Sequence, residues 1–74
     1  MIVEPVELLS VVALLADIPS ENLTRGQVGT VVECLTEDIY EVEFNDLNGR
    51  PYALLPVKSD NLLPLRHQPS SRAV

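Results

Sequence analysis

Cysteine and aromatic residues are scarce in this sequence. Its 74 residues include one cysteine, two tyrosines, one phenylalanine and no tryptophan. A single cysteine excludes an intramolecular disulfide framework. Cys34 lies in an apolar, strand-like segment, which favours a small buried hydrophobic side chain over a reactive thiol. A chain of this length forms one domain, whose core we expect to be aliphatic and which has little room for a deep substrate cleft.

Basic residues are scarce as well. The net charge is -6, and the five basic side chains are spread along the chain as Arg25, Arg50, Lys58, Arg66 and Arg72. Nucleic-acid binding depends largely on clustered lysine and arginine side chains that neutralise phosphates, so a nucleic-acid partner is disfavoured. The same acidity disfavours an anionic membrane surface and favours a basic protein as the partner.

The sequence also lacks an apolar run of transmembrane length. Residues 1 to 16 are mostly apolar, but they include Glu4 and Glu7 and lack the basic start of a secretory signal. The run is shorter than the roughly 20 residues that a transmembrane helix needs. We therefore expect a cytoplasmic protein with no membrane contact.

Five short segments have the composition of β-strands and are separated by turn residues. The first is ambiguous between a buried strand and a buried helix, and Val11, Val12 and the following Pro19 favour the strand. The pattern predicts an all-β fold, a small five-stranded barrel over residues 1–66, followed by a flexible polar tail at residues 67–74. The predicted strands are residues 8–15, 28–35, 39–44, 51–57 and 62–66.

The loop between the first two predicted strands, residues 17–27, is rich in turn residues. Leu23 is the apolar residue well inside this loop, and we expect it to anchor the loop in the core. The stretch "SENL" can form one helical turn, for which Ser20 is a suitable N-cap.

The segment "IYEVEF" shows the clearest alternation in the chain. Tyr40, Val42 and Phe44 share one face and are predicted to be core residues, whereas Glu41 and Glu43 share the other, solvated face. The turn that follows contains the pair "NG" at residues 48–49, which suits the left-handed positions of a tight hairpin turn. The next predicted strand carries two prolines, residues 51 and 56, which favour either an edge position or prolines at the ends of the strand, because proline cannot donate to a ladder.

Four motifs, "VVALLADIP", "RGQVGTVVE", "YEVEF" and "NGRPYALL", lie between residues 8 and 57. Together they resemble a family of small bacterial proteins, domain of unknown function 4926. The resemblance implies an SH3-like β-barrel without an established activity, and the proximity of some family genes to toxin-like genes points to an antitoxin or immunity role. Ser10 and Pro51 depart from the family pattern, in which aspartate and threonine are more usual. The family has no known functional residues to carry over.

The segment "RGQVGTVVECL" is also similar to the KOW element of some transcription and ribosomal proteins. Gly26, Gly29 and Val31 occupy the positions that this element requires. KOW proteins that bind RNA usually carry basic residues in their loops, whereas the corresponding turn here is the acidic "TED". Because this acidic turn counts against RNA binding, a KOW-like nucleic-acid or ribosome-associated module is the alternative function and not the first choice.

Three glutamates, Glu33, Glu41 and Glu43, are expected near one another on neighbouring strands. Paired carboxylates act as acid and base only where a cleft raises the pKa of one of them, and a convex wet face provides no such cleft. Carboxylates also suit Ca²⁺ or Mg²⁺, but the loop "NDLNG" lacks the later bidentate glutamate of a calcium site. His67 and Ser10 have no catalytic partners at usable spacing. We therefore predict no catalytic residue, cofactor or metal, and no enzyme.

The remaining candidates are contact residues. Tyr52 either points inward and adds to an aromatic-poor core, which the small core favours, or points outward as a contact residue beside Arg50. Together with Glu41 and Glu43, these two residues form the predicted interaction set. The sequence thus predicts a small acidic protein-interaction module of the antitoxin or immunity type, with homo-oligomerisation through the apolar stretch "ALLPV" compatible with it.

Overall fold

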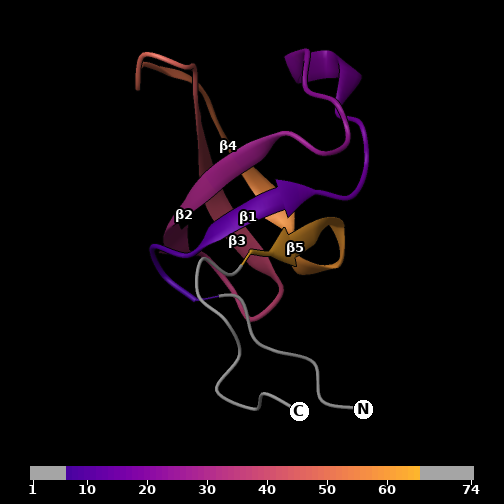
Figure 1. Ribbon diagram of the computed structural model, residues 1–74. Coiled ribbons are helices and arrows are strands. Elements are labelled where there is room, and N and C mark those ends of the chain that lie inside the picture. The colour runs from indigo at the N-terminus through magenta and orange to yellow at the C-terminus, as the bar shows by residue number, and fades with distance from the viewer. Residues whose placement is uncertain (1–6, 66–74) are drawn as a thin grey trace, which may run out of the picture.

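The computed structural model describes residues 7–65, which form one antiparallel sheet. Its strands are β1 (Val11–Leu14), β2 (Val28–Cys34), β3 (Ile39–Asn45), β4 (Pro51–Lys58) and β5 (Leu62–Pro64), in the order β4-β3-β2-β1-β5 (Figure 1). Two short 3-10 helices, η1 (Pro19–Glu21) and η2 (Ser59–Asn61), lie in the connections. The prediction of an all-β fold with five strands is confirmed, and the predicted tail at residues 67–74 lies outside the described residues.

The sheet is open and does not close into the predicted small barrel within residues 7–65. Strands β4 and β5 are the two edges of the sheet. A barrel needs a ladder that continues around the whole circumference. Strand β1 has only four residues and β5 only three, and the ladder of β5 is with β1. Because these strands are so short, no ladder joins β5 to β4 among the described residues.

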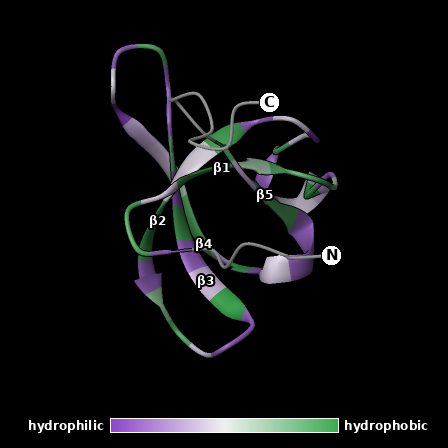
Figure 2. Cartoon of the chain, turned by 60° about the horizontal axis from the view of Figure 1, so that its bottom comes forward, coloured by the Kyte–Doolittle hydropathy of each residue, from purple (hydrophilic) through white to green (hydrophobic). Residues whose placement is uncertain are grey.

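One face of the sheet carries the hydrophobic core. Strand β3 alternates between hydrophilic and hydrophobic residues along its length (Figure 2), and its buried residues are the predicted Tyr40, Val42 and Phe44. Leu23 is also buried, which confirms that it anchors the loop before β2. Most of the core is aliphatic, as expected from the composition. Its buried members are Val12, Leu14, Leu23, Val31, Tyr40, Val42, Phe44, Val57 and Leu62.

Strand β1 begins later than the sequence predicts. Leu8 and Leu9 lie in an exposed turn, and Leu9 has a φ of 67°, in the left-handed region. A left-handed residue cannot continue an extended strand, so the ladder of β1 starts at Val11. The prediction of a strand from residue 8 is therefore wrong at its N-terminal end, although the choice of strand over helix is confirmed.

Replacing Leu9 by glycine is expected to stabilise the fold by about 0.5 to 1 kcal/mol. Glycine removes the steric cost of the left-handed conformation, which exceeds the backbone entropy that glycine loses on folding. Urea denaturation followed by circular dichroism measures the change. Leu8→Gly is the matched control, because Leu8 lies in the same turn without a positive φ. A Leu9→Gly variant that is less stable than the wild type would contradict the assigned strain.

Two predicted turn details differ in the structure. The N-cap of η1 is Ile18, and no side chain caps this helix, because Ser20 lies inside it. In the β3–β4 hairpin only Gly49 has a positive φ, of 80°. The side chain of Asp46 organises this hairpin, since its Oδ1 accepts hydrogen bonds from the backbone N–H groups of Asn48 at 2.8 Å and Arg50 at 3.0 Å.

Both edges of the sheet carry prolines that limit the addition of a further strand. Strand β4 is an edge strand, as its prolines predicted. At the end of β4, Ser59 N–H donates to Asp38 C=O, which makes residues 59 and 38 a hydrogen-bonded pair. Hydrogen-bonded and non-hydrogen-bonded pairs alternate along antiparallel strands, so the backbone nitrogen of Pro56 points to the open side of β4 and not to β3. On β5, the same alternation directs the backbone nitrogen of Pro64 to the open side of the strand. Leu62 N–H donates to Ser59 C=O, so it is not free to pair with another strand. Prolines at these outward positions offer no backbone donor to an incoming strand.

Candidate interaction surface

The face of the sheet opposite the core carries the predicted glutamates beside exposed apolar residues. In the ladders, Glu43 faces Thr30 on one side and Leu54 on the other, and Glu41 faces Pro56. Glu41 and Glu43 are half-buried, whereas Leu54 and Pro56 are exposed. We call this surface the outer face; its residues are Thr30, Glu33, Ile39, Glu41, Glu43, Leu54, Pro56 and Lys58.

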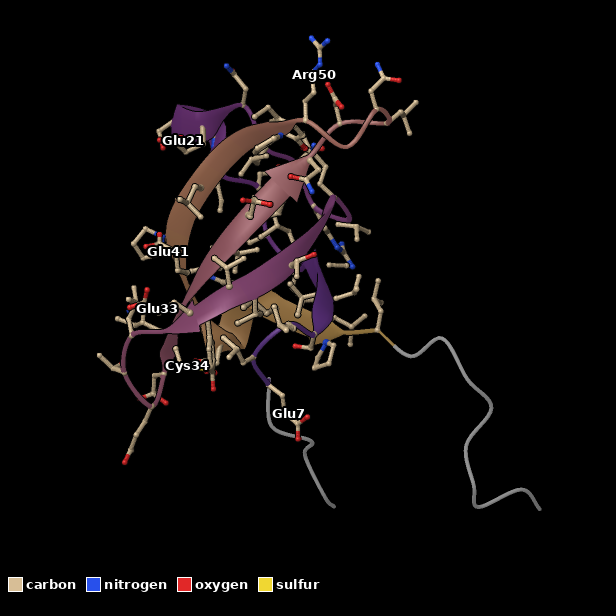
Figure 3. All side chains as sticks on the ribbon, turned by 90° about the vertical axis from the view of Figure 1, so that its left-hand side faces the viewer. Glu7, Glu21, Glu33, Cys34, Glu41 and Arg50 are labelled. Carbon is tan, nitrogen blue, oxygen red and sulfur yellow. The ribbon has the colours of Figure 1, made fainter. Side chains whose placement is uncertain are left out.

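A β-bulge places Glu33 on the outer face. The register of β2 and β3 shifts between Val31 and Glu33, so that Val32 has no partner and Glu33 lies directly opposite Glu41. Without this extra residue Glu33 would lie opposite Tyr40, on the core face. Figure 3 shows Glu33 and Glu41 projecting on the same side of the sheet. The predicted proximity of these carboxylates is thus correct, and it depends on the bulge.

The carboxylates of Glu33, Glu41 and Glu43 have no hydrogen-bonding partner among the described side chains. The side-chain hydrogen bonds within residues 7–65 lie mostly in loops and turns, and none of them reaches Glu33, Glu41 or Glu43. Lys58, opposite Ile39, lies on the same face as Glu41, one same-face position along β4 from Pro56, but no side-chain hydrogen bond joins it to Glu41 among the described residues. Like charges directly opposite each other in a sheet are destabilising.

Cys34 is exposed, so its predicted burial is wrong. The bulge sets Cys34 opposite Tyr40 at the last position of β2. The chain turns immediately afterwards, at residues 36–38, and the residues on either side of Cys34, Glu33 and Leu35, are exposed as well. A position on the core side of a strand is buried only where neighbouring elements extend over it.

Tyr52 and Arg50 lie away from the glutamate pair. Tyr52 is 47% exposed, so the inward placement favoured from the sequence is wrong, and its hydroxyl accepts a hydrogen bond from Gln27 Nε2 at 2.6 Å. Arg50 is exposed at the base of the β3–β4 hairpin, at the opposite end of the molecule from Glu33 (Figure 3). Of the predicted interaction set, Glu41 and Arg50 therefore lie on different parts of the molecule.

The structure adds exposed apolar residues that sequence reasoning did not assign to a surface. Leu47 is fully exposed at the tip of the β3–β4 hairpin, which projects beyond the sheet in Figure 1, and Leu54 is exposed on β4. The alternation within "ALLPV" was the available signal for Leu54, since Ala53 and Leu55 turn toward the core. Nothing in the sequence marks Leu47 as a surface residue beyond its position in a turn.

The described residues do not gather the ligands of a metal site. Within residues 7–65, no group of three histidine, cysteine, aspartate or glutamate side chains comes together to hold an ion. His67 lies outside this range. The same part of the chain holds no helix with the length and apolar character needed to cross a membrane.

Replacing Glu33 by glutamine is expected to stabilise the fold by a few tenths of a kcal/mol, because it removes the repulsion with Glu41 across the β2–β3 ladder. Urea denaturation at low ionic strength measures the gain, and added salt is expected to reduce it by screening the pair in the wild type. Glu37→Gln removes the same charge from a turn and serves as the control. An equal gain from both variants would show that net charge, rather than the opposed pair, determines the effect.

Comparison with known proteins identifies the family. Neither a curated protein nor a solved structure matches the chain. The family model described as Domain of unknown function (DUF4926) matches residues 8–64, which include all five strands and both faces of the sheet. The chain therefore belongs to the DUF4926 family.

Proposed function

We propose that this protein is a non-enzymatic interaction module that binds a basic protein through its outer face. The observation that carries the proposal is the direct opposition of Glu33 and Glu41. Such a pair lowers the stability of the isolated fold, and stability is commonly given up where a surface serves binding. Lysine or arginine side chains of a partner would relieve the repulsion on contact.

The surroundings of the glutamates support a protein as the partner. Glu41 and Glu43 each have an exposed apolar neighbour, Pro56 and Leu54. Burial of these apolar groups adds favourable free energy to the charge pairing, and complementary charges speed the encounter and select against acidic competitors. Because the outward prolines hinder strand addition at both edges, contact through a face of the sheet is favoured over edge pairing.

The concrete form of this proposal is an antitoxin or immunity-type protein in the cytoplasm that neutralises a basic partner. The net charge of -6 on 74 residues supports this form, since a strong opposite charge accelerates association with a basic target. A small single domain also suffices for a role that requires one complementary surface and no substrate cleft.

Affinity capture from the native host with paired charge-reversal variants tests the proposal. The double variant Glu33→Lys/Glu41→Lys reverses the opposed pair. The double variant Glu21→Lys/Asp60→Lys changes the net charge equally at exposed positions in η1 and η2. We expect a basic protein to be retained by the wild type and the control and lost from the first variant.

Two results would overturn the proposal. One is the capture of the same proteins, in the same amounts, by both double variants. The other is salt-sensitive micromolar binding of single- or double-stranded nucleic acid by the wild type in a fluorescence titration, since this would favour the KOW-like alternative.

A further inference from the structure

Three locally unfavourable features meet at one end of the sheet. Leu9 has a left-handed backbone, Val32 is the unpaired residue of the β2 bulge, and Glu33 opposes Glu41. Leu9 N–H donates to Val31 C=O at 2.7 Å, which places Leu9 beside Val32. Strained residues and bulges persist where the position of particular side chains matters. We call this region the bulge end of the sheet.

The bulge end exposes large apolar side chains. Leu8, Leu9 and Val32 are all exposed, and 71% of Leu9 is accessible. The turn that presents them is held by backbone hydrogen bonds, because Ser10 N–H donates to Glu7 C=O at 3.0 Å and Val31 N–H donates to Ser10 C=O at 3.0 Å. These bonds hold the backbone of Leu9 and Ser10 against Val31, next to Val32. We call the exposed side chains of Leu8, Leu9 and Val32 the apolar patch.

Carboxylates border the apolar patch. Glu7 precedes Leu8 in the chain, Glu33 follows Val32, and Glu41 faces Glu33 across the ladder. In Figure 3, Glu33 and Glu41 lie close together, Glu7 lies apart from them and lower in the view, and Arg50 lies at the top. A second copy of this chain would bring like charges together around the patch, so this border selects a cationic occupant.

We propose that the apolar patch binds an amphipathic segment of another protein, in which large apolar side chains are flanked by lysine or arginine. This inference rests on the proposed function and locates the contact at the bulge end. The apolar side chains of the segment bury Leu8, Leu9 and Val32, while its basic groups lie against Glu7, Glu33 and Glu41. The bulge and the left-handed Leu9 keep the patch formed before binding, which lowers the ordering cost of association.

Heteronuclear NMR with a defined probe tests the inference. The probe is a synthetic peptide in which leucine and lysine separate onto the two faces of a helix, and its control replaces every leucine by serine at the same charge. We expect the leucine–lysine peptide to shift the amide resonances of Leu8, Leu9, Val32 and Glu33 at micromolar to sub-millimolar concentration. The serine–lysine peptide is expected to bind at least about tenfold more weakly, because it has no apolar surface to bury.

Variants separate loss of the patch from loss of the fold. Leu9→Gly removes the most exposed patch side chain and is expected to raise stability, yet it should weaken peptide binding by about fivefold or more. Leu47→Ser removes a fully exposed leucine at the hairpin tip and is expected to leave binding unchanged. Val32→Ser, which also removes a patch side chain, is expected to weaken peptide binding as well.

The possible outcomes distinguish this inference from the proposed function. Resonance shifts confined to the hairpin or to β4, or equal binding of both peptides, would overturn the apolar patch while leaving a basic partner in place. The absence of leucine–lysine binding up to about 1 mM would also overturn it. Concentration-dependent shifts of the patch without peptide would overturn it as well, because they would show that a second copy of the chain occupies the patch. The proposed function itself is decided by the charge-reversal capture from the host.

Discussion

Replacing Gly29 by alanine is expected to destabilise the protein by about 3 kcal/mol, because overpacking of a tight core site costs this much. A methyl group at this position would lie 2.8 Å from Val42 Cγ1, 2.9 Å from the backbone oxygen of Glu43 and 2.9 Å from Phe44 Cδ1. Contacts this short with a backbone atom and two buried side chains are relieved only by moving β2 away from β3. For a domain of this size, the loss approaches its whole stability.

Gly49→Ala is the matched control for Gly29→Ala. Gly49 has a φ of 80°, but a methyl group there would meet nothing within 4 Å. Its cost is therefore conformational and amounts to about 1 kcal/mol. Urea denaturation of the two variants, followed by circular dichroism, gives both values. Equal losses would show that close packing at Gly29 does not control the stability of the sheet.

Truncating Phe44 to alanine is expected to cost about 4 kcal/mol, from lost burial and from the cavity that remains. The ring is fully buried and is opposite Gly29 on one side and Ala53 on the other. These two small residues leave the space that the ring fills. No large neighbour beside the ring in the ladder can fill the cavity after truncation, so relaxation recovers little of the loss.

The Phe44→Ala variant is expected to be largely unfolded at 25 °C, as judged by the loss of the strand signal in circular dichroism and of dispersion in the NMR spectrum. Leu47→Ala is the control, because Leu47 is fully exposed in the hairpin that follows the same strand. It is expected to change stability by less than about 0.5 kcal/mol. A folded Phe44→Ala variant with a normal unfolding transition would contradict this account of the core.

The acidic outer face and the stability of the core are separable. Gly29 and Phe44 act on the buried side of the sheet, whereas Glu33→Gln and Leu9→Gly are expected to stabilise the protein while removing proposed binding groups. Variants that gain stability and lose binding distinguish a binding surface from a structural one. The opposed glutamates and the left-handed Leu9 are therefore the informative positions for function.

The strands and the core of β3 were predictable from local pattern. The alternation of Tyr40, Val42 and Phe44 with glutamates requires one buried and one wet face, whatever the strand pairs with. The prolines at residues 51 and 56 likewise predicted an edge strand, because proline removes a ladder donor wherever it lies. The resemblance over residues 8–57 also predicted the family, and the family model confirmed it.

Other features depended on pairing that no local pattern contains. The alternation from Gly29 through Val31 places Glu33 on the core face, and only the register shift at Val32 moves it to the outer face. The same shift carries Cys34 to an uncovered position at the end of β2. A single extra residue reverses the orientation of the residues that follow. The sequence of one strand does not show at which position, relative to its partner strand, the extra residue will lie.

Composition and the two-residue period of a strand were enough to predict the all-β class, the mostly aliphatic core, the acidic surface, the turn-rich loop at residues 17–27 and the hairpin turn at residues 48–49. Other features depend on how the strands pack and pair: the sheet stays open, the left-handed Leu9 delays the start of the first strand, Tyr52 lies half exposed and Glu33 faces Glu41. Each of these depends on which strands meet and in what register. That choice is made by the packing of the whole chain, in which contacts between residues distant in sequence outweigh local preference.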